Sequence, residues 1–185
     1  AGEVYLGDVF GNDALYTLNQ LGAATPEPPS LLSQTGAFVD TANFELSDYW
    51  VPYELNQPFW SDGADKFRWI ALPNDGNRDT AAEKVAYSEN GVWSYPVGTV
   101  TMKHFDLVLD ENDPSDRTRL ETRFLVLGDD GQWYGVTYRW LPDQSDAELL
   151  TSFATADYTI ALADGGTRDQ SWYFPSRDEC SSCHL

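Results

Sequence analysis

The pattern of hydrophobic and polar residues predicts strands along most of the chain after residue 65. Apolar Phe67, Trp69 and Ala71 alternate with their neighbours, as expected of a strand that buries one face. The turn sequence at 128–131, Gly-Asp-Asp-Gly, separates two apolar runs and predicts a hairpin. The predicted strands are residues 66–72, 84–87, 98–109, 119–127, 132–140, 158–162 and 171–174.

Helical spacing is confined to two short stretches. Leu15, Leu18 and Leu21 are three positions apart and predict a helix from Asn12 to Leu21, and residues 146–153 suggest one or two helical turns. Residues 36–65 are aromatic and rich in Asn, Asp and Pro, which predicts packed loops with short strands. The fold class expected is all-β, an antiparallel sandwich or barrel-like structure with minor helix and long loops.

Composition and charge restrict the functions that this fold can serve. The chain has 185 residues, of which 42% are hydrophobic, so it is too apolar for a disordered acidic protein. It has 11 basic against 30 acidic side chains and a formal charge of −19. We therefore expect no nucleic-acid partner, because phosphate binding needs clustered Lys and Arg. No apolar run approaches the ~20 residues of a membrane helix, so no membrane insertion is expected.

The strongest chemical motif lies at the C-terminal end. Cys180, Cys183 and His184 form C-x-x-C-H, the attachment motif of c-type haem. Two thiols at this spacing reach the two vinyl groups on one porphyrin edge, and the following His binds the iron as proximal ligand. The sequence therefore predicts one covalent haem c per chain.

Two other interpretations of the two cysteines remain open. A disulfide between Cys180 and Cys183 is compatible with an oxidising compartment. A structural zinc site would need four Cys or His ligands, and the chain contains two Cys and two His in all.

Elimination suggests a sixth iron ligand. The usual protein ligands opposite a proximal His are His and Met, and the chain offers only His104 and Met102. The two residues share a face of the predicted strand because they are two positions apart. We favour His104 as the distal ligand and keep Met102 as the alternative, with a ligand from elsewhere or none as a third.

The position of the motif raises the question of what covers the haem. Only Leu185 follows His184, so we expect Trp172 to cover a haem face and Arg177 to pair with a propionate. We also expect the haem at or near a subunit interface, with His104 supplied by another copy of the chain. Such a head-to-tail contact closes into a ring or continues as an extracellular cytochrome filament. A chain cut just after the motif is the alternative explanation.

An acidic loop offers a second, weaker metal site. Oxygen ligands gather at Asp110, Asn112, Asp113 and Asp116, which suits Ca²⁺, although the spacing is not that of an EF-hand. A solvated hairpin loop is the competing interpretation.

Several segments together resemble a known family. They are residues 53–64, Lys66, residues 68–69, 98–99, 103–105 and 120–123, and residues 174–177 before Cys180. In this combination the chain, over roughly residues 36 to 184, resembles a family of secreted and mostly uncharacterised bacterial c-type haem proteins, some of them associated with quinoprotein sugar dehydrogenases. The resemblance implies an extracytoplasmic haem protein in which Lys103-His104-Phe105 matters.

These observations lead to one expected organisation and function. Residues 1–35 form an N-terminal segment or linker, residues 36–175 a β domain, and residues 176–185 a haem-attachment tail. The function expected is that of a non-enzymatic, extracytoplasmic monohaem cytochrome that transfers electrons, with redox proteins and other copies of itself as partners. The alternatives are a haem-bearing electron acceptor of a sugar or alcohol dehydrogenase system, and a carbohydrate-binding β domain with a terminal disulfide.

Overall fold

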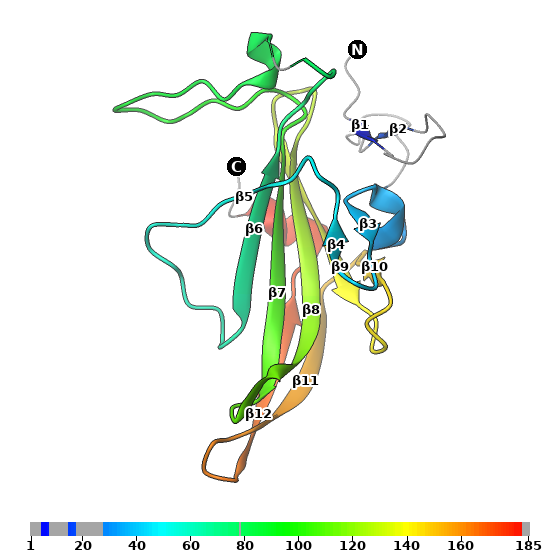
Figure 1. Ribbon diagram of the computed structural model, residues 1–185, viewed down its shortest axis with the longest axis vertical. Helices are drawn as coiled ribbons and strands as arrows, with labels where there is room; N and C mark the ends of the chain where they lie inside the picture. Colours follow the sequence, from blue (N-terminus) through cyan, green and yellow to red (C-terminus); the bar gives the residue numbers. More distant parts are fainter. Residues whose placement is uncertain (1–4, 8–14, 18–27, 78, 183–185) are drawn as a thin grey trace.

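The fold is built on one large sheet. The computed structural model describes residues 5–7, 15–17, 28–77 and 79–182 (Figure 1). Within them an eight-stranded sheet has the order β10-β9-β8-β7-β11-β12. Strand β6 also pairs with β7, on the edge of β7 that does not pair with β8, and β5 pairs with β6. The bounds are β5 Val51–Pro52, β6 Asp65–Ala71, β7 Val100–Asp110, β8 Asp113–Leu127, β9 Trp133–Trp140, β10 Ala147–Leu149, β11 Ala154–Ala161 and β12 Thr167–Phe174.

The smaller elements surround this sheet. Two short hairpins, β1–β2 and β3–β4, pair antiparallel. The remaining elements are β1 Tyr5–Gly7, β2 Leu15–Thr17, β3 Phe38–Asp40, β4 Glu45–Leu46, the 3₁₀ helices η1 Leu32–Thr35 and η2 Ala81–Glu83, and α1 Arg177–Ser181. The expected all-β class with minor helix is therefore confirmed. Within the described residues, no helix has the length and hydropathy to span a membrane.

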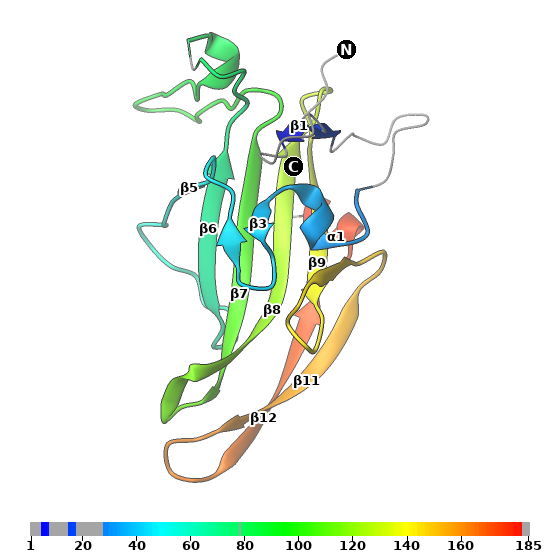
Figure 2. The same ribbon diagram turned by 45° about the vertical axis from the view of Figure 1, so that its right-hand side comes forward.

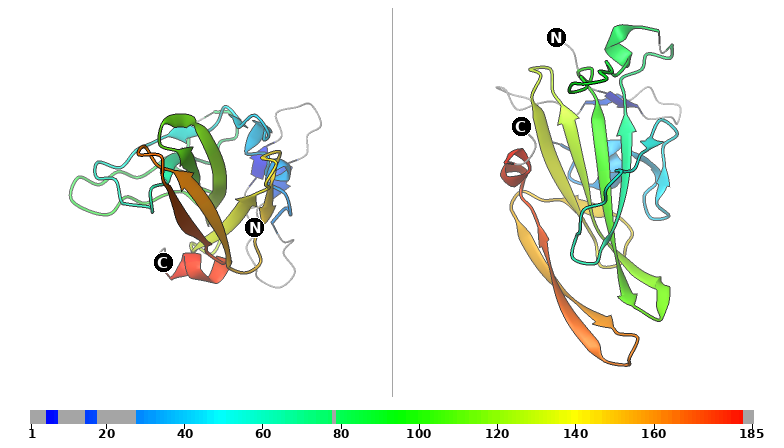
Figure 3. Two further views of the ribbon diagram at one scale, coloured as in Figure 1. Left: turned by 90° about the horizontal axis from the view of Figure 1, so that it is seen from below. Right: turned by 90° about the vertical axis from the view of Figure 1, so that its left-hand side faces the viewer.

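The two faces of the central strands carry different side chains, because residues alternate along each strand. We call one the η1 face; Met102, His104, Thr122, Phe124 and Tyr138 point from it, as their cross-strand pairing shows. We call the other the α1 face, and it carries Lys103, Phe105, Glu121, Arg123, Gly135 and Thr137. In Figure 3, right, α1 lies on one side of the sheet and the segment with β3 and β4 on the other.

The core on the η1 face is closed by residues 28–50, which cross β7 and β8 in Figure 2. Leu32 is fully buried against Met102 and Phe124 of the sheet. The Tyr138 hydroxyl donates a hydrogen bond of 2.8 Å to the Pro29 carbonyl. Residues 28–35, which the sequence assigns to an N-terminal segment, thus pack into the same core as the β domain.

The core on the α1 face lies under the β11–β12 hairpin. Phe105, Leu107 and Leu120 of the sheet pack against Trp172 and Phe174 of β12. The pairing of β7 with β8 shifts between Phe105 and Asp106, so that strand β8 carries one extra residue, Leu120, at this point. The hairpin is joined to β7 by one parallel pair, Ala161 with Asp110.

Two helices expected from the sequence are wrong where the structure describes them, which for the stretch from Asn12 to Leu21 is residues 15–17. Leu15–Thr17 forms strand β2, which pairs with β1. Ala147–Leu149 forms β10, which pairs with β9 through Trp140, Arg139 and Tyr138. In both places a neighbouring strand supplies backbone hydrogen bonds, and this tertiary pairing overrides the local helical spacing.

Candidate functional site

Helix α1, which carries the first cysteine of the motif, is fixed at its N-terminal end. The Glu179 carboxylate accepts hydrogen bonds of 2.7 and 2.8 Å from the N–H and hydroxyl of Ser176, which closes a capping box. The hydroxyl of Tyr173 also donates to Glu179. Hydrogen bonds from Tyr173 and Ser176 hold the pKa of Glu179 below its usual value. The local sequence therefore starts a helix directly after β12 and sets the direction of Cys180.

Cys180 is docked against the central sheet. It packs on Gly135, where an added Cβ would overlap the Cβ of Cys180 and lie 2.8 Å from its Sγ. The Sγ is 3.5 Å from the Ser176 carbonyl oxygen, to which the thiol donates. Burial raises the pKa of Cys180, so the thiol is protonated near neutral pH. Cys183 and His184 lie outside the described residues.

A buried polar cluster lies beside Cys180 on the α1 face. The Glu121 side chain is fully buried, and Arg123 and Trp172 both donate to its Oε1, Trp172 at 3.1 Å. Glu121 Oε2 and Arg123 Nε have no hydrogen-bond partner within the described part of the chain. Burial raises the pKa of Glu121 despite the adjacent Arg123. Unsatisfied buried polar atoms are rare and costly, so this cluster is a candidate site for a further polar group.

The two residues expected to contact haem have other contacts here. Trp172 is 5% exposed and packs in the core with Phe105. Arg177 places its guanidinium 5.3 Å from the ring centre of Tyr134. Both residues lie near Cys180 in the fold. Arg177 is three positions before it in α1, and Trp172 donates a hydrogen bond to Glu121, whose charge acts on the Cys180 thiol.

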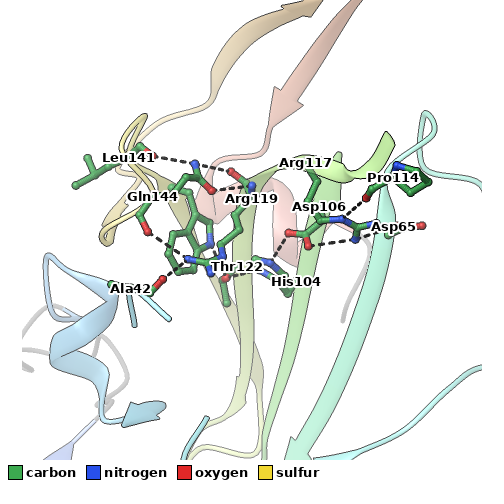
Figure 4. Close-up of polar contacts among 11 residues, drawn as sticks. Ala42, Asp65, His104, Asp106, Pro114, Arg117, Arg119, Thr122, Leu141 and Gln144 are labelled. Atoms are coloured by element: carbon green, nitrogen blue, oxygen red, sulfur yellow. Dashed lines mark hydrogen bonds and ion pairs between the residues drawn. The ribbon is translucent and has the colours of Figure 1, made fainter. Parts of the chain in front are cut away.

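The His104 imidazole is held at both ring nitrogens (Figure 4). Its Nδ1 lies 2.8 Å from the Thr122 hydroxyl oxygen and its Nε2 lies 2.7 Å from Asp106 Oδ1. The Trp140 indole N–H donates to the same Thr122 oxygen at 3.0 Å. A neutral His104 therefore accepts a hydrogen bond from the Thr122 hydroxyl at Nδ1 and donates one from Nε2 to the Asp106 carboxylate. Burial lowers the pKa of His104, which supports the neutral form.

A pocket of about 550 Å³ opens beside this imidazole. Its lining combines aromatic walls with polar groups: Phe44, Phe67, Trp69, His104, Asp106, Arg117, Arg119 and Gln144. Phe44 covers His104 with ring centres 4.2 Å apart, although its φ of 56° is unusual for a bulky residue. Arg119 stacks 4.7 Å from the ring centre of Trp140 and donates to the carbonyls of Ala42 and Gln144.

Charges in this pocket are paired. Arg117 Nη1 lies 3.3 Å from Asp65 Oδ2 and 3.6 Å from Asp106 Oδ2. With His104 neutral, the lining carries Arg117, Arg119 and Asp106, and Asp65 next to the pocket supplies the second carboxylate. The pocket therefore has no excess of either sign, which favours an uncharged ligand over an ion.

Neither candidate for the sixth iron ligand faces Cys180. His104 and Met102 point from the η1 face, whereas Cys180 packs on the α1 face against Gly135. Met102 is fully buried in the core and does not reach a group outside it. His104 is 2% exposed and its Nε2 is already bonded to Asp106. Coordination by His104 stays a prediction, and in this fold it requires a haem from another copy and the release of Asp106.

The acidic loop expected to bind calcium uses its oxygens locally. Asp110 Oδ1 accepts from the Asn112 N–H at 2.8 Å, and Asp113 Oδ1 accepts from the Ser115 N–H at 3.0 Å. Asp116 is exposed. Across the described ranges, no three His, Cys, Asp or Glu side chains are grouped so as to hold a metal ion.

Gly135 escapes analysis of the sequence alone. Lys103, Glu121 and Arg123 lie in segments of the family resemblance, but their arrangement around Cys180 depends on strand register and on the position of α1. The signal that could have indicated this cluster is the pairing of the predicted strands 98–109 and 119–127, which places Lys103 opposite Arg123.

The chain matches no family model, no curated protein and no solved structure.

Proposed function

We propose that this chain is a c-type haem protein that transfers electrons outside the cytoplasm. The observation that carries the proposal is the C-x-x-C-H motif, whose first cysteine is held by a capped helix against a glycine of the sheet. A bound haem would supply a reversible one-electron couple at iron. The chain supplies the two thiols and His184 as proximal ligand.

The residues around Cys180 fit a covalently attached porphyrin. Attachment adds each cysteine S–H across a vinyl group, so the new C–S bond needs no oxidant. The protonated form of Cys180, favoured by its burial, suits this addition. Gly135 leaves room on the sheet for α1. Glu121 Oε2 and Arg123 Nε, which have no hydrogen-bond partner among the described residues, offer an acceptor and a donor next to the attachment point.

Partners follow from the same proposal. The chain would exchange electrons with redox proteins, among them a sugar or alcohol dehydrogenase. Self-assembly is a further part of the proposal, since His104 and Cys180 face away from each other and a shared haem would link successive copies. A charge of −19 opposes such stacking, so assembly should strengthen with salt.

The decisive experiment is expression with a cytochrome c maturation system, followed by a pyridine haemochrome assay and intact mass. We expect one covalent haem per chain. The double variant Cys180→Ala/Cys183→Ala should carry none, while Ser182→Ala, a change at an exposed residue between the cysteines, should keep it. A haem-free wild-type chain whose mass is lower by two hydrogens would favour the disulfide and overturn the proposal.

The pocket on the η1 face favours a second function, the binding of an uncharged polar ligand such as a sugar. Phe67 and Trp69 offer aromatic faces for the apolar side of a sugar ring, and their ring centres are 6.3 Å apart. Asp106, Arg117 and Gln144 offer hydroxyl partners at the same pocket.

A titration of tryptophan fluorescence with mono- and disaccharides would test this second function. We expect saturable quenching that Trp69→Leu removes and Trp93→Leu, at an exposed tryptophan outside the pocket, retains. Unsaturable or identical responses in both variants would remove sugar binding from consideration.

A further inference from the structure

Basic side chains gather on the α1 face although the chain as a whole is acidic. Of the 11 Lys and Arg residues, five project from neighbouring strands β6 to β9 onto this face. We call them the basic strip: Lys66, Arg68, Lys103, Arg123 and Arg139. Strand pairing brings two acidic side chains to this strip, Glu121 on β8 and Glu148 on β10, and both are directly opposite Arg139.

The central members of the strip are cross-strand neighbours. Arg68 on β6 is directly opposite Lys103 on β7, and Lys103 is directly opposite Arg123 on β8. Like charges in directly opposed positions destabilise a sheet unless an anion lies between them. Burial and then the charges of Arg123 and Arg68 lower the pKa of Lys103, which reflects this repulsion.

Few of the basic side chains in the strip are paired with a carboxylate. Arg123 pairs with Glu121, Lys66 donates to the Phe59 carbonyl, and Arg139 stacks 5.0 Å from the Phe174 ring centre. The side chains of Arg68 and Lys103 have neither a hydrogen bond nor an ion pair with any described residue. Arg123 Nε is buried and also unpartnered within the described residues. Within the described residues, the carboxylate nearest Lys103 is thus Glu121, which is bonded to Arg123 and Trp172, and neither Arg68 nor Lys103 has an ion pair of its own.

The strip starts beside the attachment cysteine and extends away from it. Cys180 packs on Gly135 of β9. Burial raises the pKa of its thiol, and the charge of Arg123 on the next strand is close enough to oppose part of this rise. From β9 to β7 is two strand spacings of ~4.8 Å, so Lys103 lies roughly 10 Å across the sheet from the attachment strand. This separation is comparable to the width of a porphyrin, whose two propionates project from the edge opposite the vinyl groups.

We propose that the basic strip binds the propionates of the haem attached at Cys180, with Lys103 and Arg68 as the partners farthest from the thioether edge. The proposal rests on the proposed haem function. Lys and Arg form short charge-assisted hydrogen bonds to carboxylates, which would neutralise the two opposed cations. The same contacts would hold the porphyrin along the α1 face, so that it lies against the sheet instead of extending into solvent.

The test uses the haem-loaded chain and three variants: Lys103→Gln, Arg68→Gln and the control Arg168→Gln. Arg168 is an exposed cation on β12, away from the strip. The first readout is the infrared difference between oxidised and reduced protein carrying haem labelled with ¹³C at the propionate carboxyls. The second is the reduction potential, because removing a nearby cation favours the ferric form and lowers the potential.

We expect Lys103→Gln and Arg68→Gln to shift the labelled carboxylate bands and lower the potential, and Arg168→Gln to change neither. Unshifted bands in both strip variants, with haem still attached, would overturn the propionate assignment and leave the haem function intact. Band shifts of the same size in Arg168→Gln would also overturn it, since they would report general charge alone. A wild-type chain without haem would overturn both proposals, and the haemochrome assay separates this result from the others.

Discussion

Gly135 and Cys180 are in direct contact across the surface of the sheet. A Cβ at position 135 would overlap the Cβ of Cys180 and lie 3.3 Å from Leu125 Cδ2. No side chain larger than hydrogen leaves α1 in its position. The glycine on β9 and the cysteine of the motif are 45 positions apart in the sequence, yet each limits what the other can be.

The first prediction concerns this contact. Gly135→Ala should push α1 away from β9 and lower the free energy of unfolding by about 1–3 kcal/mol, as overpacked sites do. In the haem-loaded protein it should also lower the yield of covalent haem, because Cys180 would be misdirected. Urea unfolding and the ratio of haem to protein measure the two effects.

Gly166→Ala is the matched control for this change. An added Cβ there meets only Asp164 Oδ1 at 3.2 Å and Leu162 at 3.8 Å in an exposed turn. It should leave haem yield unchanged. If Gly135→Ala were as stable and as well loaded as Gly166→Ala, the docking of α1 on β9 would be wrong.

The second prediction concerns pH and His104. Burial holds the pKa of His104 below its usual 6.5, so below pH 6.5 the unfolded chain binds more protons than the folded chain. The free energy of unfolding should therefore fall as pH drops below 6.5, with a slope of at most about 1.4 kcal/mol per pH unit from this residue. His104→Gln should lose that part of the slope.

The comparison is made by urea unfolding of wild type and His104→Gln between pH 5 and 8. All other groups titrate alike in both proteins, so the difference between the curves isolates His104. A constant difference over this range would show that His104 does not have a lowered pKa. Asp106→Asn should lower the pKa of His104 further in an NMR titration, because the carboxylate hydrogen bond favours the protonated ring.

The third prediction concerns the buried carboxylate. Burial raises the pKa of Glu121 above 4.5, so the folded chain holds this proton more tightly than the unfolded chain and loses stability as pH rises through the folded pKa. Glu121→Gln keeps a partner for Trp172 and lacks this loss. The difference in free energy of unfolding between Glu121→Gln and wild type should therefore favour the variant more at pH 8 than at pH 4.

Glu121→Ala provides the comparison for the third prediction. It leaves Arg123 and the Trp172 indole N–H without their shared acceptor and should cost at least about 1–3 kcal/mol at every pH. A relative stability of Glu121→Gln that does not change between pH 4 and pH 8 would contradict the raised pKa.

The fourth prediction concerns Met102, the alternative iron ligand. Met102 is fully buried beside Phe124 and Val126. Met102→Leu conserves volume and apolar character, so it should cost less than about 1.5 kcal/mol. The visible spectrum of the haem-loaded protein should not change. A switch of spin state in this variant would instead identify Met102 as a ligand and require the core around it to open.

Most strands of the large sheet were predictable because each buries one face and so alternates in the sequence. Phe67 and Trp69 on β6 illustrate this, and the turn at 128–131 fixed the β8–β9 hairpin correctly. The strand expected at 84–87 is wrong, because only Ala86 pairs there, in a single bridge with Ser94. The strand at Ala147–Leu149 was not predictable, because its three residues are strand only through pairing with the edge of β9. The same holds for Leu15–Thr17 and its partner β1.

In the candidate site, too, local features could be predicted from the sequence and tertiary contacts could not. The motif at Cys180 is local and could be read directly, whereas the contact with Gly135 depends on tertiary structure. The sequence places Met102 and His104 on one face of a strand, which the structure bears out. It could not say that Cys180 would pack on the other face, because that depends on where β12 ends and how α1 turns back.

The basic strip also gives the α1 face a local charge opposite in sign to the net charge of the chain. Five of the 11 Lys and Arg side chains project onto the α1 face of a chain whose net charge is −19, so this face carries a local cluster of positive charge. Near a negatively charged surface, such as a cathode, the protein should turn that face forward even while its net charge repels it. Cys180 lies on this face, so such an orientation would bring the proposed haem toward the electrode.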